Sequence, residues 1–243
     1  MISINIKTPY IYPVIILTIL LATSISGCLD TPEAKPAKVD ASVLSEYGWE
    51  KNGNVSYESY EKSMTGFNVS INTAITTYQD KMLSDQISRQ IQNLQTINNI
   101  TLNTDSGAEY IGSRLITINI TLPAGVEIPD TVMSKIVDTQ MEELTNQANI
   151  DNFNKRESEK IDISNGSTAN VDYYVGSVPA NGFSIDVRGV IASWSSPDST
   201  IIAIGVVPDG DIKLNIKGDE IKVITINGEK EMDDVTELIK SID

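Results

Sequence analysis

Histidine is absent from this 243-residue sequence, and cysteine occurs once, at Cys28. Without imidazole, the chain cannot form a Ser-His-Asp or Cys-His nucleophile system or a histidine-ligated zinc site. A single thiol also excludes an intrachain disulfide and a zinc–cysteine cluster. The chemistry left to the chain is that of hydroxyl, amide, carboxylate and amine groups, and we expect no cofactor.

Basic residues are also scarce. The chain carries 18 Lys and Arg against 33 Asp and Glu, which gives a net charge of −15. Phosphate binding needs a basic surface, whereas the basic residues here are scattered singly, so nucleic acid is not an expected partner. With 40% hydrophobic residues and no repeat, the length suits one globular domain with its own core.

The first 28 residues have the pattern of an export signal. Lys7 precedes an apolar run over residues 14–22, and small residues lead up to Gly27 and Cys28. The apolar run is nearer ten residues than the roughly twenty needed to span a bilayer. The ending ISGC resembles a lipobox, in which cleavage falls before the cysteine and the thiol receives a lipid. We therefore predict a signal peptide over residues 1–27 and a diacylglyceryl-type lipid on Cys28, because two acyl chains hold a protein stably on a membrane.

Residues 28–40 are expected to form the lipidated cysteine and a tether. The stretch LDTPEAKPAKVD is polar, and Pro32 and Pro36 favour an extended chain. At roughly 3 Å per residue, this tether would let the domain of residues 41–243 stand about 35 Å from the bilayer. The predicted location is the extracytoplasmic face of the cell membrane.

Hydrophobic periodicity predicts both strands and helices in the domain. Alternating apolar and polar residues indicate strands with one wet face over residues 67–76 and 116–122. Apolar residues at helical spacing indicate a helix over residues 83–97, with Asp80 as a candidate cap, and another that begins after Pro129 and Asp130 and runs to Ala148. A closing helix follows over residues 232–242.

Further strands are expected between residues 159 and 226. A turn at Asn165-Gly166 predicts a hairpin, and residues 200–207 are apolar without alternation, which is typical of a central strand covered on both faces. Turns are also expected at residues 208–210 (PDG) and at Asn227-Gly228. The order predicts an α+β fold, a mostly antiparallel sheet packed against about three helices.

The opening of the domain, residues 44–49 (LSEYGW), follows a lipobox and a short tether. In this it resembles a family of archaeal lipoproteins classed as a domain of unknown function, over most of residues 41–243. The resemblance implies an extracytoplasmic position, and it offers no catalytic residues to carry over to this chain. The closing hairpin and helix are similar to the PsbP-like fold, whose members are mostly accessory binding subunits; this is an analogy of fold alone.

Five Asn-x-Ser/Thr sequons are candidate glycan acceptors in an exported protein. About three to four would arise by chance from the composition, so their number alone carries little weight. Two of them are expected on the polar faces of strands and two in turns. The acceptors are Asn54, Asn68, Asn99, Asn119 and Asn165.

Acidic residues give few candidate sites. Asp209, Asp211, Asp219 and Glu220 surround two turns, but their spacing matches no EF-hand loop and turn-forming Asp is the favoured interpretation. A glycosidase needs two converging carboxylates, whereas neighbouring residues of a helix diverge. We therefore expect solvated helix faces at Glu142-Glu143 and Asp233-Asp234.

A polar loop near Trp194 is the remaining candidate. Ser195, Ser196 and Ser199 flank Pro197, without the Gly-x-Ser-x-Gly turn of a hydrolase. Trp194 is interpreted either as a contact for a partner or as a half-buried residue at a strand end.

Three functions remain open, and the first is favoured. It is a non-enzymatic, lipid-anchored module that binds or supports another envelope protein. The alternative is a carrier of a small ligand or lipid, with a pocket between sheet and helices. The third is a hydrolase that uses two carboxylates alone.

Overall fold

The structure is a computed structural model, and it describes most of the chain after residue 30. The predicted signal peptide, Cys28 and most of the predicted helix over residues 130–148 lie outside the described residues. Within the described part, no helix has the length and apolar character needed to cross a membrane. The described residues are 31–64, 67–98, 112–123, 150–180, 183–196, 199–216 and 219–243, with Ile136, Val137, Thr139 and Glu142.

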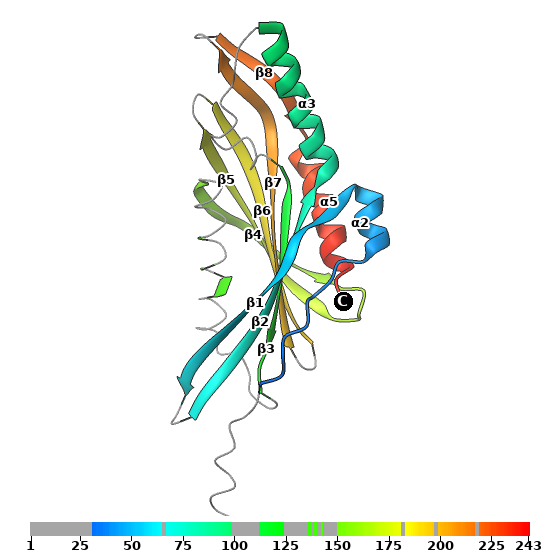
Figure 1. The fold of residues 1–243 in the computed structure, drawn as a ribbon, viewed down its shortest axis with the longest axis vertical. Coiled ribbons are helices and arrows are strands. Elements are labelled where there is room, and N and C mark those ends of the chain that lie inside the picture. Colours follow the sequence, from blue (N-terminus) through cyan, green and yellow to red (C-terminus); the bar gives the residue numbers. More distant parts are fainter. Residues whose placement is uncertain are drawn as a thin grey trace, which may run out of the picture.

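The described residues form one long antiparallel sheet with helices packed on it (Figure 1). The strand order is β1-β2-β3-β7-β6-β5-β4, and β8 pairs with β7 alone. This confirms the predicted α+β fold with a mostly antiparallel sheet. The strands are β1 (Trp49–Met64), β2 (Phe67–Asp80), β3 (Arg114–Thr121), β4 (Asp151–Asp162), β5 (Thr168–Ala180), β6 (Phe183–Ser196), β7 (Ser199–Ile216) and β8 (Asp219–Ile226). The helices with described bounds are α2 (Ala41–Tyr47), α3 (Lys81–Asn98) and α5 (Gly228–Lys240).

Strand β7 joins the two ends of the molecule because it pairs with three other strands. Its first half lies between β3 and β6, which confirms the expected central strand over residues 200–207. Its second half pairs with β8. The predicted turn at residues 208–210 is wrong, since the strand continues through them. Gly210 takes a left-handed conformation (φ 83°) at the point where β7 exchanges β6 for β8.

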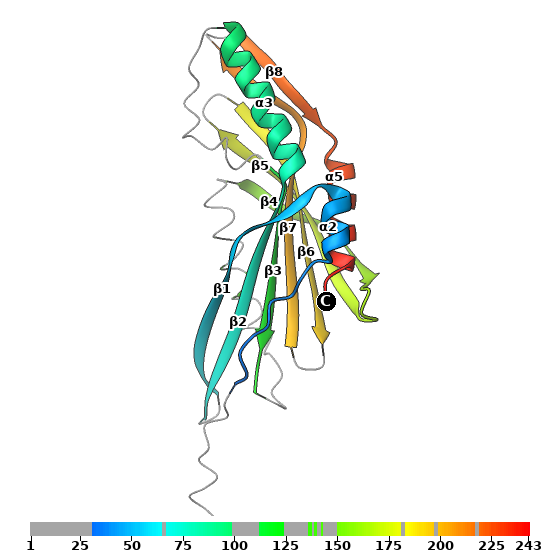
Figure 2. The same ribbon diagram turned by 45° about the vertical axis from the view of Figure 1, so that its right-hand side comes forward.

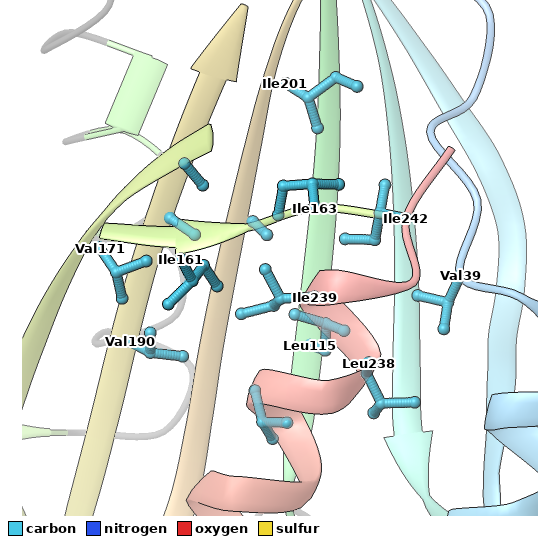
Figure 3. Packing of buried hydrophobic residues seen from close by; sticks show 14 of the residues in the cluster. Val39, Leu115, Ile161, Ile163, Val171, Val190, Ile201, Leu238, Ile239 and Ile242 are labelled. Carbon is cyan, nitrogen blue, oxygen red and sulfur yellow. The ribbon is translucent and has the colours of Figure 1, made fainter. Parts of the chain in front are cut away.

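One face of the sheet is covered by α5, and the largest hydrophobic core lies between them (Figure 3). Leu238 and Ile239 of α5 and the following Ile242 are fully buried against Leu115 and Val190 of the sheet. The Asn227 side chain accepts the Lys230 amide (3.3 Å) and caps α5. The predicted hairpin turn at Asn227-Gly228 is therefore wrong, because the same residue type that favours a turn also favours a helix N-cap.

Two further cores complete the fold. On the opposite face of the sheet, isoleucines of β2, β3 and β7 pack together with Ile136. Farther along β7, helix α3 lies beside β8 (Figure 2), and Leu83, Ile87 and Ile91 pack on Ile212 and Val223. This core between α3, β7 and β8 joins the elements that extend beyond the main sheet.

Two elements were not predicted: strand β1, which is polar, and helix α2, which is short. Among the described residues, strand β1 (WEKNGNVSYESYEKSM) is an edge strand that pairs on one side only, with β2, and such a strand needs no alternation of apolar residues. Its register with β2 shifts between Asn52 and Ser56. Helix α2 is short, but its ends follow known preferences: Asp40 caps its start and Gly48 takes a left-handed conformation at its end.

Gly189 on β6 gives a first test of the packing. A Cβ atom there would lie 2.1 Å from Cζ of Phe153, whose ring stacks on Tyr174 at a centroid distance of 5.0 Å. We expect Gly189→Ala to lower the free energy of unfolding by about 1–3 kcal/mol in a denaturant titration. In a Phe153→Ala background the same change should cost much less. An equal cost in both backgrounds would contradict this packing.

Candidate functional site

Residues 31–39, called here the docked segment, lie on the sheet. In Figure 2 the segment, drawn in blue, runs along β2 and β3 up to α2. Ala34, Ala37 and Val39 are buried, with exposed fractions of 3%, 1% and 5%. The segment is extended, as expected of the tether, but it is packed, so that it is not a free spacer in this conformation.

The sheet holds the docked segment by its backbone. The segment is not part of a helix or sheet, so its carbonyl oxygens need hydrogen-bond donors from elsewhere. Amide and hydroxyl side chains of β2 and β3 supply these donors. Asn72 Nδ2 donates to Thr31 O (3.1 Å) and Pro32 O (2.9 Å), Asn119 Nδ2 to Lys35 O (2.7 Å), and Thr117 Oγ1 to Ala37 O (2.8 Å). At the two ends, Thr31 Oγ1 donates to Ser70 O (2.6 Å) and the Val39 amide donates to Tyr78 Oη (3.2 Å).

The docked segment also joins the two ends of the domain. The Lys38 amide donates to Asp243 O (3.1 Å), and the Asp243 amide donates back to Lys38 O (3.0 Å). The Ser241 hydroxyl accepts the Asp40 amide (3.4 Å), next to the cap of α2. Displacing the segment would therefore also free the C-terminus and the start of α2.

The expected wet face of β3 is covered where the docked segment crosses it. Thr117 is 0% exposed and Asn119 is 8% exposed. The expected exposure of Asn119 on the polar face of its strand is wrong, because its amide donates to Lys35 O under the docked segment. Threonine and asparagine at alternate positions indicate that this face of the strand meets polar groups. Here those groups are backbone carbonyls of the docked segment rather than water.

The other sequons differ in their surroundings. Asn54 is exposed on β1, and Asn165 is exposed in the turn before β5, where its Oδ1 accepts the Ser167 amide (2.9 Å). Asn68 lies on β2, and Asn99 lies outside the described residues. Glycosylation at these four positions stays a prediction.

The acidic residues around the β7–β8 region take part in pairs. Asp209 accepts from Arg188 Nε (2.6 Å) and from the Gly228 amide (3.0 Å), which ties β7 to the start of α5. Asp211 pairs with Lys222 Nζ (2.8 Å), and Glu220 lies 3.5 Å from Lys213 Nζ. Asp219 is exposed. Among the described residues, no group of three or more ligating side chains could hold a metal ion.

The remaining predicted candidates do not converge. Glu142 is exposed and Glu143 lies outside the described residues. Asp233 is exposed as expected, but Asp234 is 9% exposed and pairs with Lys230 Nζ (2.5 Å), so a solvated position is wrong for Asp234. The two neighbours thus point in different directions.

The serine loop joins β6 to β7. Ser196 pairs with Ser199 across these two strands, Ser195 is exposed, and Pro197 lies outside the described residues. Trp194 is 3% exposed and belongs to the core under α5. It is therefore neither half-buried nor placed to contact a partner.

Two carboxyl groups that the sequence did not connect meet where β2, α3 and α5 come together. Asp80 is 4% exposed, and its Oδ1 accepts the Leu83 amide (2.8 Å), which confirms it as the cap of α3. Glu231, in the first turn of α5, hydrogen-bonds to Asp80 and accepts from Ser113 Oγ (3.2 Å). Sequence alone gives no signal for a contact between residues so far apart in the chain.

Asp80 is buried and Glu231 is half-buried, and the pKa values of both carboxyl groups are raised. Desolvation raises the pKa of Asp80. Desolvation, and then the charge of Asp80, raise the pKa of Glu231 to about 7. Neither residue lines the pocket described next, so the pair joins three elements of the fold and does not face a cleft.

A pocket of about 340 Å³ lies between α5 and strands β4–β6. Its lining is mostly charged or hydroxyl-bearing, and includes Arg156, Glu159, Tyr173 and Asp233. Tyr173 Oη donates to Glu159 Oε1 (2.6 Å); burial, and then this bond, raise the pKa of Tyr173 to about 12. The pocket has the position expected for a ligand carrier, but charged and hydroxyl-bearing side chains make up most of its lining, which suits a lipid poorly.

The family model described as a domain of unknown function (DUF6517) matches residues 36–243. The chain belongs to this family. The match confirms the resemblance to an uncharacterised family, while the archaeal lipoprotein character stays a prediction. Comparisons with curated proteins and with solved structures found no match. The PsbP-like similarity therefore remains an analogy.

Two neighbouring threonines test the docked segment. Thr117 and Thr76 are paired across β3 and β2, and both are buried. Thr117 bonds to the segment, whereas the Thr76 hydroxyl has no partner among the described residues. We expect Thr117→Val to lower the free energy of unfolding by about 1–2 kcal/mol, because it leaves the Ala37 carbonyl unpaired. The isosteric control Thr76→Val should be neutral or stabilising. Equal losses of stability in the Thr117→Val and Thr76→Val proteins would contradict the hydrogen bond from Thr117 to Ala37 O.

Glu231 predicts a pH dependence. Its native pKa of about 7 lies above the ordinary glutamate pKa of 4.5, so between these two pH values the native state holds a proton that the unfolded state releases. Stability is then fully present at low pH and lost as pH rises through 7. Glu231→Gln should raise the free energy of unfolding by about 1–3 kcal/mol at pH 8 and change it little at pH 5.

The matched control is Glu229→Gln, since Glu229 is exposed on the same helical turn. It should change stability by less than about 0.5 kcal/mol at either pH. Thermal unfolding of the three proteins at pH 5 and pH 8 provides the measurement. A Glu231→Gln protein that is destabilised equally at both pH values would rule out a raised pKa of Glu231 as the cause.

Proposed function

We propose that this protein is a lipoprotein anchored through Cys28 to the extracytoplasmic face of the cell membrane, where its domain binds or supports another envelope protein. The observation that carries the proposal is the docked segment. Thr31, three residues after Cys28, is already bonded to the sheet. A lipid on Cys28 would therefore position the whole domain at the membrane, which suits a module that must meet a partner there.

The use of the acidic side chains supports a binding role rather than catalysis. Asp80 caps α3 and bonds to Glu231, Asp209 ties β7 to α5, and Asp234 pairs within α5. A carboxylate hydrolase needs two acidic groups that face each other across a space large enough for a substrate. Here the two that meet are in contact and are held by neighbouring elements.

A ligand carrier is the second candidate. The pocket between α5 and β4–β6 supports it, with arginines and acids on its walls. Such a lining suits a small polar ligand that carries both charges, and it does not suit an acyl chain.

Native mass spectrometry tests the anchor. The mature protein should begin at Cys28 and carry the mass of a diacylglyceryl-type lipid, and any glycans should map to exposed sequons such as Asn54 and Asn165. Cys28→Ser should abolish the lipid mass and release the protein from washed membranes. A native chain that starts at Met1 with a free thiol would overturn the proposal.

Crosslinking in intact membranes tests the partner. We expect lipidated protein to be recovered with one envelope protein, while Cys28→Ser, with the same folded domain, should lose that crosslink. Recovery of the anchored protein alone under gentle solubilisation, with no crosslinked species, would contradict a role as a binding or supporting module.

A further inference from the structure

The path of the docked segment determines which end of the sheet its N-terminal side reaches. Thr31 is bonded to Ser70 and Asn72 near the start of β2, whereas Val39 is bonded to Tyr78 near the end of β2. The segment thus runs parallel to β2. Its beginning lies at the end of the sheet where β1 joins β2, where β3 ends, and where β6 joins β7. We call this the proximal end.

The opposite, distal end is formed by α3 and the β7–β8 hairpin (Figure 1). Strand β7 connects the two ends, from Ser199, paired with Thr121, to Ile216, paired with Asp219. Its 18 residues span up to roughly 60 Å at about 3.3 Å per residue. By contrast, the three residues from Cys28 to Thr31 reach at most about 11 Å.

Three of the strands that reach the proximal end have hydroxyl-bearing residues there. The described ends of β3, β6 and β7 there carry hydroxyl groups, from Thr121, Ser195, Ser196, Ser199 and Thr200. Ion pairs join residues of α3, of α5 and of strands β4–β8. The part of β1 at the proximal end carries Glu58, Glu61 and Lys62, so this end is not free of charge, and the orientation rests on the path of the docked segment.

We propose that the proximal end rests on the bilayer surface and that α3 and the β7–β8 hairpin point away from it. This rests on the proposed lipid at Cys28. A free tether would leave the orientation open, whereas a segment bonded to the sheet from Thr31 onward restricts the lipid to the proximal end. The distal end then stands away from the bilayer by about the length of β7.

Energy transfer to the membrane tests the orientation. In the lipidated full chain the thiol of Cys28 is consumed, so an added cysteine is the only free one. Ser195→Cys labels the proximal end and Glu220→Cys the distal end, and both positions are exposed. Each protein is labelled with a donor dye and reconstituted in phosphatidylcholine vesicles that contain an acceptor-labelled lipid. Transfer should be severalfold higher from Ser195→Cys than from Glu220→Cys.

A second variant shows whether docking causes the orientation. Inserting about twelve Gly and Ser residues between Leu29 and Asp30 leaves the docked segment intact but lets the proximal end leave the surface. The difference between the two labels should shrink. Equal transfer from both labels without the insertion, or higher transfer from Glu220→Cys, overturns the orientation while the anchor stands. Protein that remains in the buffer fraction with a free Cys28 thiol overturns the anchor itself, and the orientation with it.

Discussion

The hydrogen bonds between the side chains of β2 and β3 and the backbone of residues 31–39 are the constraint on which the rest of the structure depends. They place an extended segment on a polar strip of the sheet beside α5. The segment leads directly into the cap of α2 at Asp40, and its Lys38 pairs with Asp243 after α5. The N-terminus, the C-terminus and the main core are thereby joined at one place.

Directional bonds, more than apolar burial, determine the position of this segment. Its buried side chains are two alanines and a valine, whose burial contributes a few kcal/mol at about 25 cal/mol per Å² of apolar surface. The side-chain bonds to its backbone contribute about 0.5–1.5 kcal/mol each, a similar sum. Apolar burial is not directional, so by itself it would allow the docked segment to shift along the sheet. The asparagines and threonines do not tolerate it, because each carbonyl must meet its donor.

Much of the fold follows from hydrophobic periodicity. Strands β2, β3 and β7 and helices α3 and α5 are predicted because each has an apolar side that contacts a core. Strand β1 gives no such signal, since it is a polar edge strand. The turn signals at residues 208–210 and Asn227-Gly228 were misleading for a different reason: Gly210 serves a change of strand partner and Asn227 caps a helix. The local preferences of Gly210 and Asn227 were identified correctly. Whether such a residue forms a turn, continues a strand or caps a helix depends on contacts with distant parts of the chain.

The contacts of the candidate site could not be predicted from the sequence. Thr117 and Asn119 look like residues of a wet face, and Asp80 like a simple helix cap. Their partners, Ala37, Lys35 and Glu231, lie about 80 to 150 positions away in the chain, and no local pattern reports them. What the sequence does provide is Cys28 and the lipobox. The structure connects this motif to the sheet through the docked segment.

Hydrogen–deuterium exchange of the mature chain, followed residue by residue, is the most direct test of the docked segment. The amides of Lys38, Val39 and Asp243 donate to Asp243, Tyr78 and Lys38. They should exchange far more slowly than amides of an unstructured chain, and the Thr117→Val protein should lose part of this protection. Exchange of all three at the rate of an unstructured peptide in the folded protein would contradict a segment fixed on the sheet.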